Sequence, residues 1–181
     1  MRVRGLLLAA ALAGCVTPAA PPPHVERTML TPADAATGLL AGGALTLSLS
    51  TPANQPAGDD PVINMTLATA DGRALGFTEA NHAPYDVMAQ TAGGPLAQAM
   101  GLFGEEAPKL YAANATQNHG APFLCGPDGP AYVGVYAAPD GSETIVALKS
   151  GFDFEAQSDG SYLPIPFSPD HVCARMKFRR G

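Results

Sequence analysis

Segments in which apolar and polar residues alternate are the feature that most limits what this chain can fold into. Leu45, Leu47 and Leu49 alternate with polar residues, which is the period-two pattern of a strand with one buried face. Asp-Gly pairs, which favour tight hairpin turns, separate several such segments. The predicted strands cover residues 45–49, 63–67, 75–77, 132–138, 143–150, 152–157, 162–167 and 172–179. The chain is therefore expected to fold mainly as antiparallel β-sheet.

The hairpin around Asp71-Gly72 has a register that hydrophobicity predicts. A two-residue loop would divide its apolar residues between both faces of the sheet. A three-residue loop, with Gly72 in the left-handed conformation, sets Leu67 opposite Leu75 and Met65 opposite Phe77, which keeps one face apolar. We therefore predict a type I turn with a G1 bulge.

The hairpin around Asp159-Gly160 is predicted by the same argument to have a two-residue loop. This loop pairs Phe154 with Ile165 and Ala156 with Leu163. Prolines at 164 and 166 lack the N–H that a ladder needs, so the strand over 162–167 is expected at a sheet edge or to be irregular.

Short helices are predicted in two places. Thr31-Pro32-Ala33-Asp34 has the pattern of a helix start, with Thr31 as N-cap, and Gly38 or Gly42-Gly43 would end this helix. Residues 84–113 do not alternate, and helices are predicted there over 96–103 and 108–114, packed on one face of the sheet. The expected fold is therefore α+β, a small sandwich or barrel with short helical inserts.

The charge of the chain indicates which kinds of binding partner are unfavourable. The chain has 10 Lys and Arg against 16 Asp and Glu, a formal net charge of −6. This acidic balance disfavours nucleic acid, because binding phosphates needs many basic residues. The hydrophobic fraction of 46% argues against general disorder.

The first fifteen residues resemble the signal of bacterial lipoproteins. Arg2 and Arg4 precede an apolar run over 5–14, which is too short to span a membrane as a helix. Leu12-Ala13-Gly14-Cys15 resembles a lipobox. The resemblance implies cleavage after Gly14 and a lipid on Cys15, and Val16 after the cysteine implies the outer membrane. The alternative is an ordinary cleaved signal, with Cys15 lost or free.

Three regions follow from this interpretation. Residues 1–14 are the signal peptide, residues 15–27 are the lipidated cysteine with a Pro/Ala-rich stalk, and residues 28–181 form one β-rich domain. The ordered part is expected to begin between Val25 and Leu30. The predicted location is the bacterial outer membrane, with the domain in the periplasm or at the cell surface.

Two further cysteines, Cys125 and Cys173, remain for the domain. Exported compartments are oxidising, so a disulfide between them is expected, closing a loop worth roughly 3–4 kcal/mol of stability. Two buried thiols or a metal pair are the alternatives. Neither cysteine belongs to a CxxC motif.

The C-terminal strand carries a cluster of basic residues, Arg175, Lys177, Arg179 and Arg180. In a strand, residues 175, 177 and 179 share one face. One interpretation is a cationic strip that binds an acidic envelope component or protein. The other is a solvated edge strand whose charges prevent edge-to-edge pairing.

No catalytic or cofactor motif is present. GxSxG, SxxK, GxGxxG, the P-loop and HExxH are all missing, so no cofactor and no metal are expected. The expected function is non-enzymatic binding or scaffolding in the envelope. In size, anchor and β character the chain is similar to small lipoproteins that inhibit lysozyme, which implies an inhibitor-like role and brings no site residue with it.

The alternative function is a periplasmic ligand-binding module or a hydrolase. Its pocket would lie between residues 84–113 and the C-terminal sheet, with His82 or His119 beside a carboxylate such as Asp86.

Overall fold

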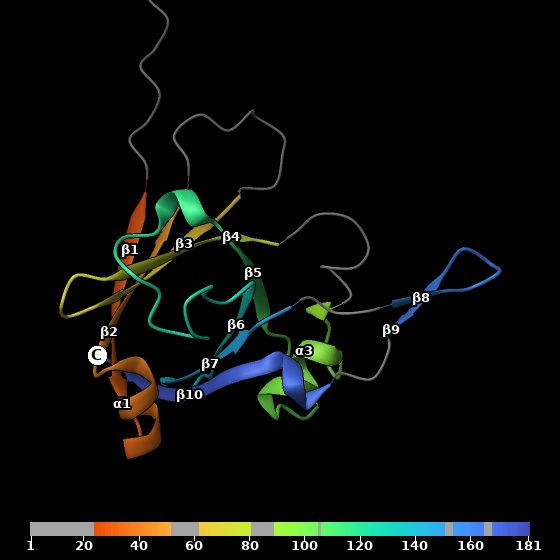
Figure 1. Ribbon diagram of the computed structural model, residues 1–181. Helices are drawn as coiled ribbons and strands as arrows, with labels where there is room; N and C mark the ends of the chain where they lie inside the picture. The colour runs from red at the N-terminus through yellow and green to blue at the C-terminus, as the bar shows by residue number, and fades with distance from the viewer. Residues whose placement is uncertain (1–23, 52–61, 81–88, 105, 151–153, 165–167) are drawn as a thin grey trace, which may run out of the picture.

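The computed structural model describes residues 24–51, 62–80, 89–104, 106–150, 154–164 and 168–181 (Figure 1). Within these residues, eight antiparallel strands form a closed barrel in the order β1-β10-β7-β6-β5-β4-β3-β2. The predicted fold class, mainly antiparallel β with short helices, is confirmed. The barrel strands are β1 (Val25–Pro32), β2 (Leu45–Ser50), β3 (Asn64–Thr69), β4 (Ala74–Glu79), β5 (Lys109–Ala113), β6 (Tyr132–Ala137), β7 (Ser142–Leu148) and β10 (Val172–Arg180).

Short elements decorate this barrel. The helices are α1 (Ala35–Ala41) and α3 (Pro95–Met100), and the 3-10 turns are η1 (Ala115–Gln117) and η2 (Pro169–His171). Strands β8 (Phe154–Ala156) and β9 (Tyr162–Pro164) form a separate two-stranded hairpin that projects from the barrel in Figure 1. In the described part of the chain β9 pairs with β8 alone, so its proline stands at an edge, as predicted.

The barrel has two distinct ends. Because neighbouring strands are antiparallel, the β2–β3, β4–β5 and β6–β7 connections lie at one end, with the start of β1 and the end of β10. We call this the mouth end. The other end, the plug end, holds α1, the β3–β4 turn and the connections from β5 to β6 and from β7 to β10.

Alternate residues of each strand point into the barrel and fill most of it. Side chains in this interior are apolar and almost entirely excluded from solvent. They include Leu30, Leu45, Leu47, Met65, Leu67, Leu75, Phe77, Val133, Ile145, Met176 and Phe178. Eight strands give an interior just wide enough for such side chains.

A second apolar cluster lies outside the barrel, beneath α3. Leu96 and Met100 of this helix pack with Leu110, Val146 and Leu148 on the outer faces of β5 and β7. The approach is close at Gly134, where an added Cβ would lie 2.5 Å from Leu96 Cδ1. Glycine is therefore needed at this position of β6.

The helix predicted over 108–114 is wrong, because this segment is β5. It pairs with β4 and β6. Leu110 faces the cluster beneath α3 and Tyr111 faces the barrel interior, so both are buried. A strand covered on both faces has no alternation, which is why the pattern resembled a helix.

The β3–β4 hairpin has the predicted register. Leu67 pairs with Leu75 and Met65 with Phe77. Gly72 has φ of +88°, and its N–H donates to the Thr69 carbonyl at 3.1 Å. The three-residue loop is thereby closed with glycine in the left-handed conformation.

The predicted register of the β8–β9 hairpin is wrong by one residue. Ala156 pairs with Tyr162 and Glu155 with Leu163, which leaves a three-residue loop that ends at Gly160 (φ +82°). Asp159 accepts hydrogen bonds from the N–H and hydroxyl of Ser161. Glu155, Ala156 and Leu163 are exposed, so burial of these three residues does not select the register, and the turn at Asp159-Gly160 fits the observed one. Ile165 lies outside the described residues.

Both helices differ at their ends from the prediction. Thr31 and Pro32 belong to β1, and Asp34 is the N-cap of α1, accepting from Thr37 N at 2.7 Å. An aspartate caps a helix as well as threonine does. Helix α1 ends at Gly42, as predicted, whereas α3 ends at Gly101 rather than near Gly104. Strand β1 begins at Val25, so residues 25–27 belong to the barrel and not to the stalk.

Candidate functional site

A cavity of about 320 Å³ opens inside the barrel at the mouth end. Its volume is at the lower end of the roughly 300–1,000 Å³ found for small-molecule sites. Apolar side chains of β2, β3 and β6 line one part of it, and charged and tyrosine side chains line the rest. The lining residues are Glu26, Thr28, Leu47, Leu49, Met65, Ala107, Lys109, Tyr111, Val135, Tyr136, Ala137, Glu143 and Arg180.

Two ion pairs flank the cavity. Arg180 Nε lies 2.5 Å from Glu143 Oε2, and Lys109 Nζ lies 2.8 Å from Glu79 Oε1. The carboxylate side chains are 2% and 8% exposed, whereas the cations are 42% and 62% exposed. Each pair therefore has its negative partner inside the protein and its positive partner toward solvent. A carboxylate buried in this way depends on its cation.

Tyr111 lines the cavity together with Lys109, Glu143 and Arg180 of these pairs. Its side chain is 4% exposed and lines the cavity from β5. Burial first, and then the carboxylates of Glu79 and Glu143, raise the pKa of Tyr111 to about 12. Among the described residues its hydroxyl has no hydrogen-bond partner, so the cavity holds a buried polar group able to bind a ligand.

The charged groups take the interior positions nearest the mouth on their strands. One step deeper on the same face of each strand is a large buried apolar residue. These pairs of successive interior residues are Phe77 and Glu79, Ile145 and Glu143, and Phe178 and Arg180. Sequence reasoning missed them. One sequence signal could have found them: each charged residue lies two positions from an apolar interior residue and therefore points to the same side of the strand. A charged residue at a strand end is ordinarily expected to contact solvent, so this signal is easily overlooked.

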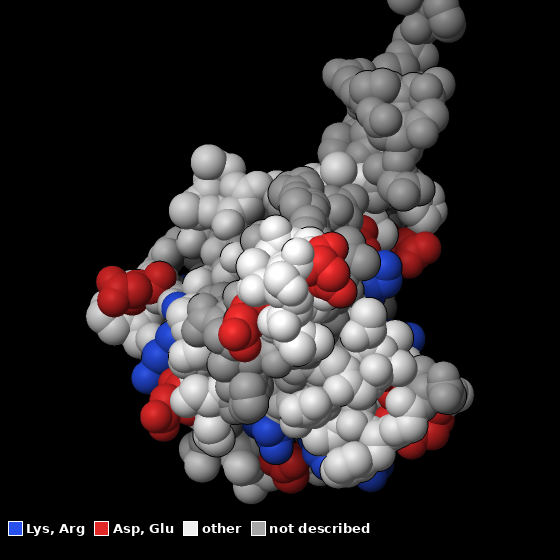
Figure 2. Space-filling model, turned by 90° about the vertical axis from the view of Figure 1, so that its right-hand side faces the viewer, with Lys and Arg blue, Asp and Glu red and all other residues white. Residues whose placement is uncertain are grey.

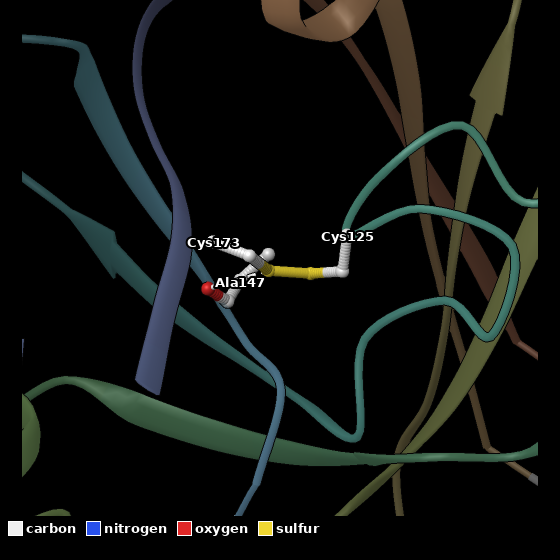
Figure 3. Close-up of a disulfide and its surroundings, with 3 residues drawn as sticks. All are labelled: Cys125, Ala147 and Cys173. Carbon is white, nitrogen blue, oxygen red and sulfur yellow. Dashed lines mark hydrogen bonds between the residues drawn. A yellow bond between two sulfur atoms is a disulfide. The ribbon is translucent and has the colours of Figure 1, made fainter. Parts of the chain in front are cut away.

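The plug end is closed by the loop between η1 and β6. Leu124 is buried against the interior cluster and Phe123 packs beside it. Cys125 of this loop forms the predicted disulfide with Cys173, with Cα atoms 5.2 Å apart (Figure 3). Cys173 occupies a bulge in β10, where the register shifts between Val172 and Ala174. In the described part of the chain, the barrel is thus closed at the plug end and holds its cavity at the mouth end.

The basic residues of β10 do not act as one group. Arg180 points into the mouth, and Arg175 donates to the Ala99 carbonyl at the end of α3. Lys177 and Arg179 remain exposed on the outer face. On the face shown in Figure 2, basic and acidic side chains of the described residues lie interspersed.

The interpretation of this segment as an edge strand is wrong. Strand β10 pairs with β1 on one side and with β7 on the other. Barrel closure removes the edge that the charges were expected to protect. The acidic-partner hypothesis for the same residues stays a prediction.

A groove of about 410 Å³ lies where the alternative function placed its pocket. It separates α3 from η2 and β10 and is lined by Gln98, Ala99, Pro169, Val172 and Arg175. His119 lies elsewhere, in a backbone bridge with Ala74 at the plug end, and His82 and Asp86 fall outside the described residues. The described part of the chain holds no group of three or more His, Cys, Asp or Glu arranged for a metal ion.

No helix in the described ranges has the length and apolar character needed to cross a bilayer. Comparison of the chain with protein-family models, with curated proteins and with solved structures found no match. The choice of the mouth as the candidate site therefore depends on its geometry.

Proposed function

We propose that this protein is an exported, lipid-anchored binding protein that holds a small amphiphilic molecule in the mouth of its barrel. The observation that carries the proposal is the cavity of about 320 Å³, with apolar side chains on one part of its wall and ion-paired and tyrosine groups on the rest. Sites of this composition bind a ligand's apolar body and orient its polar end.

The chemistry of the lining favours binding over hydrolysis. The described lining residues include no Ser, Cys or His, which are the usual nucleophiles and bases of hydrolases. Glu143 is paired with Arg180, whose Nε lies 2.5 Å from its Oε2. The role of this protein is therefore to hold its ligand unchanged.

The anchor part of the proposal is supported by Leu12-Ala13-Gly14-Cys15 and by the start of β1 at Val25. Mass spectrometry of the protein from a bacterial host is expected to show a diacylated Cys15 as the first residue. A Cys15→Ser variant is expected to lose the lipid and the membrane association. An uncut, unmodified N-terminus would contradict the anchor and leave the cavity unaffected.

The binding part is tested with residues 16–181 exported behind a cleavable signal, since every barrel strand lies within residues 25–180. Hexan-1-ol is titrated while the methyl resonance of Met65, a lining residue, is followed by NMR. The expected result is a saturable shift. Leu49→Trp, which fills the cavity, is expected to abolish the shift, and Leu39→Trp on the exposed face of α1 to leave it unchanged. No saturable shift in the unsubstituted protein would contradict the proposal.

A further inference from the structure

We infer that the polar end of the ligand is a cation, an organic ammonium group attached to an apolar body. The inference rests on the proposed function and names the ligand class of the same cavity. It follows from how the charges of the mouth are arranged and from the position of Tyr111.

Among the described residues, carboxylates outnumber cations at the mouth. Glu26 and Glu143 line the cavity with Lys109 and Arg180, and Glu79, the ion-pair partner of Lys109, adds a third carboxylate. Glu26 is exposed at the rim and, among the described residues, forms no ion pair. One carboxylate is therefore available to a positively charged ligand without breaking any contact of the folded protein.

The two ion pairs differ in how deeply their partners are buried. Glu79 and Glu143 are buried, whereas Lys109 and Arg180 are partly exposed and line the cavity together with Glu143. A charge inside the cavity is less screened than one in water. A cation there is attracted to both carboxylates and leaves both pairs intact.

An anion in the same place would contact Arg180 or Lys109 and would also meet the Glu26 and Glu143 carboxylates that line the cavity. An anion that drew Arg180 away from Glu143 would leave that buried carboxylate without its partner, which is costly. The carboxylates therefore favour ammonium ligands over carboxylate and phosphate ligands.

Tyr111 is the second, independent feature that fits an ammonium group. Its side chain is more than nine-tenths buried, lines the cavity, and has a hydroxyl with no hydrogen-bond partner among the described residues. The hydroxyl oxygen can accept an N–H of the ligand. Burial first, and then Glu79 and Glu143, raise the pKa of Tyr111 to about 12, and the contribution of the two carboxylates is the part that a nearby cation would oppose. The rings of Tyr111 and Tyr136 both line the cavity and offer cation–π contacts.

The test compares three probes of equal length, n-hexylammonium, hexan-1-ol and hexanoate, with residues 16–181 at pH 7. Affinities come from the Met65 methyl shift. Hexylammonium is expected to bind tightest, at least about tenfold tighter than hexanoate, with hexanol between them. Glu26→Gln and Tyr111→Phe are each expected to reduce the preference for ammonium over carboxylate by about threefold or more. Glu155→Gln, an exposed carboxylate of β8, serves as the matched control and is expected to leave the preference unchanged.

The outcomes separate this inference from the proposed function. If hexanol binds saturably and hexanoate binds as tightly as hexylammonium or more tightly, the inference of a cationic ligand is overturned. The cavity would still be a binding site. A preference that persists in both Glu26→Gln and Tyr111→Phe also overturns the inference. Absence of saturable binding by all three probes overturns the binding site itself.

Discussion

Arg180 Nε lies 2.5 Å from Glu143 Oε2 and joins the end of β10 to the start of β7 inside the barrel mouth. The neighbouring Arg179 points the other way and is exposed. Two adjacent arginines therefore have different roles, one inside the cavity wall and one on the outer surface. Substituting each arginine in turn therefore compares an ion-paired position in the cavity wall with an exposed position next to it.

Arg180→Ala is expected to destabilise the protein, because it leaves the Glu143 carboxylate buried without a partner. The expected loss is about 1–3 kcal/mol in the free energy of unfolding, measured by urea denaturation at pH 7. Arg179→Ala, at the exposed position, is expected to change it by less than about 0.5 kcal/mol. Glu143→Gln combined with Arg180→Ala is expected to recover part of the loss. Equal effects of the two single substitutions would contradict the inward placement of Arg180.

Removal of the disulfide is expected to loosen the plug end. Cys125 and Cys173 are separated by 48 residues, and the combined Cys125→Ser and Cys173→Ser substitutions are expected to cost about 3–4 kcal/mol. Urea denaturation with and without a reductant measures the effect. The reductant should destabilise the unsubstituted protein and have no effect on the double variant. If the reductant also lowered the free energy of unfolding of the double variant, its effect could not be assigned to the Cys125–Cys173 disulfide.

Two glycines are expected to respond in opposite directions to alanine. At Gly76 an added Cβ would lie 2.2 Å from Gln117 Cβ and 3.1 Å from Gln117 backbone atoms, so Gly76→Ala is expected to cost about 1–3 kcal/mol. At Gly38, inside α1, the added Cβ would be 3.8 Å from Pro32 Cβ, an ordinary contact. Gly38→Ala is expected to stabilise by up to about 1 kcal/mol. Thermal denaturation of both variants checks the two signs, and a neutral Gly76→Ala would contradict the close packing of η1 on β4.

The β3–β4 turn is expected to show acid sensitivity at low pH. The Thr69 hydroxyl donates to Asp71, as does Arg73 Nε, and together they lower the pKa of Asp71 to about 2. An unfolded aspartate titrates near 3.9, so the unfolded chain takes up the proton first. The stabilising contribution of Asp71 is therefore complete above about pH 4 and is lost as the pH falls toward 2.

Carboxyl NMR titration measures this pKa directly. Thr69→Val is expected to move the pKa of Asp71 upward, toward its ordinary value, because the first of its donors is gone. The pKa of Asp140, which Ser142 lowers in another turn, provides the internal control and should not move. A pKa of Asp71 unchanged in Thr69→Val would exclude the hydroxyl as the main cause.

The alternation of apolar and polar residues predicted the strands that have one buried and one exposed face. Leu45 and Leu47 on β2, Met65 and Leu67 on β3, and Met176 and Phe178 on β10 alternate because only one face is covered. Strand β5 was missed because α3 covers its outer face and the barrel its inner face. The closure of the sheet depends on β1 pairing with β10, through Leu30 and Arg180. That contact joins distant parts of the chain and leaves no local signal.

The candidate site was missed for a similar reason. Cys125 and Cys173 were predicted as a pair because the domain has no other cysteine to assign. Arg180 was assigned to a basic cluster on β10, and nothing in the sequence connected it with Glu143. Only the three-dimensional register places both in one cavity wall. In the β8–β9 hairpin, hydrophobic matching predicted the wrong register because Ala156 and Leu163, which it paired, are both exposed, and the Asp159-Gly160 turn fits the observed register.

Strand β1 enters the barrel at Val25, next to Glu26 on the rim of the opening. In a chain tethered through Cys15, the ten residues from Cys15 to Val25 reach at most about 35 Å even when fully extended. If Cys15 carries the proposed lipid, the rim of the opening would stay within about 35 Å of the bilayer surface. A ligand released from the mouth would then enter the water layer next to the lipid headgroups.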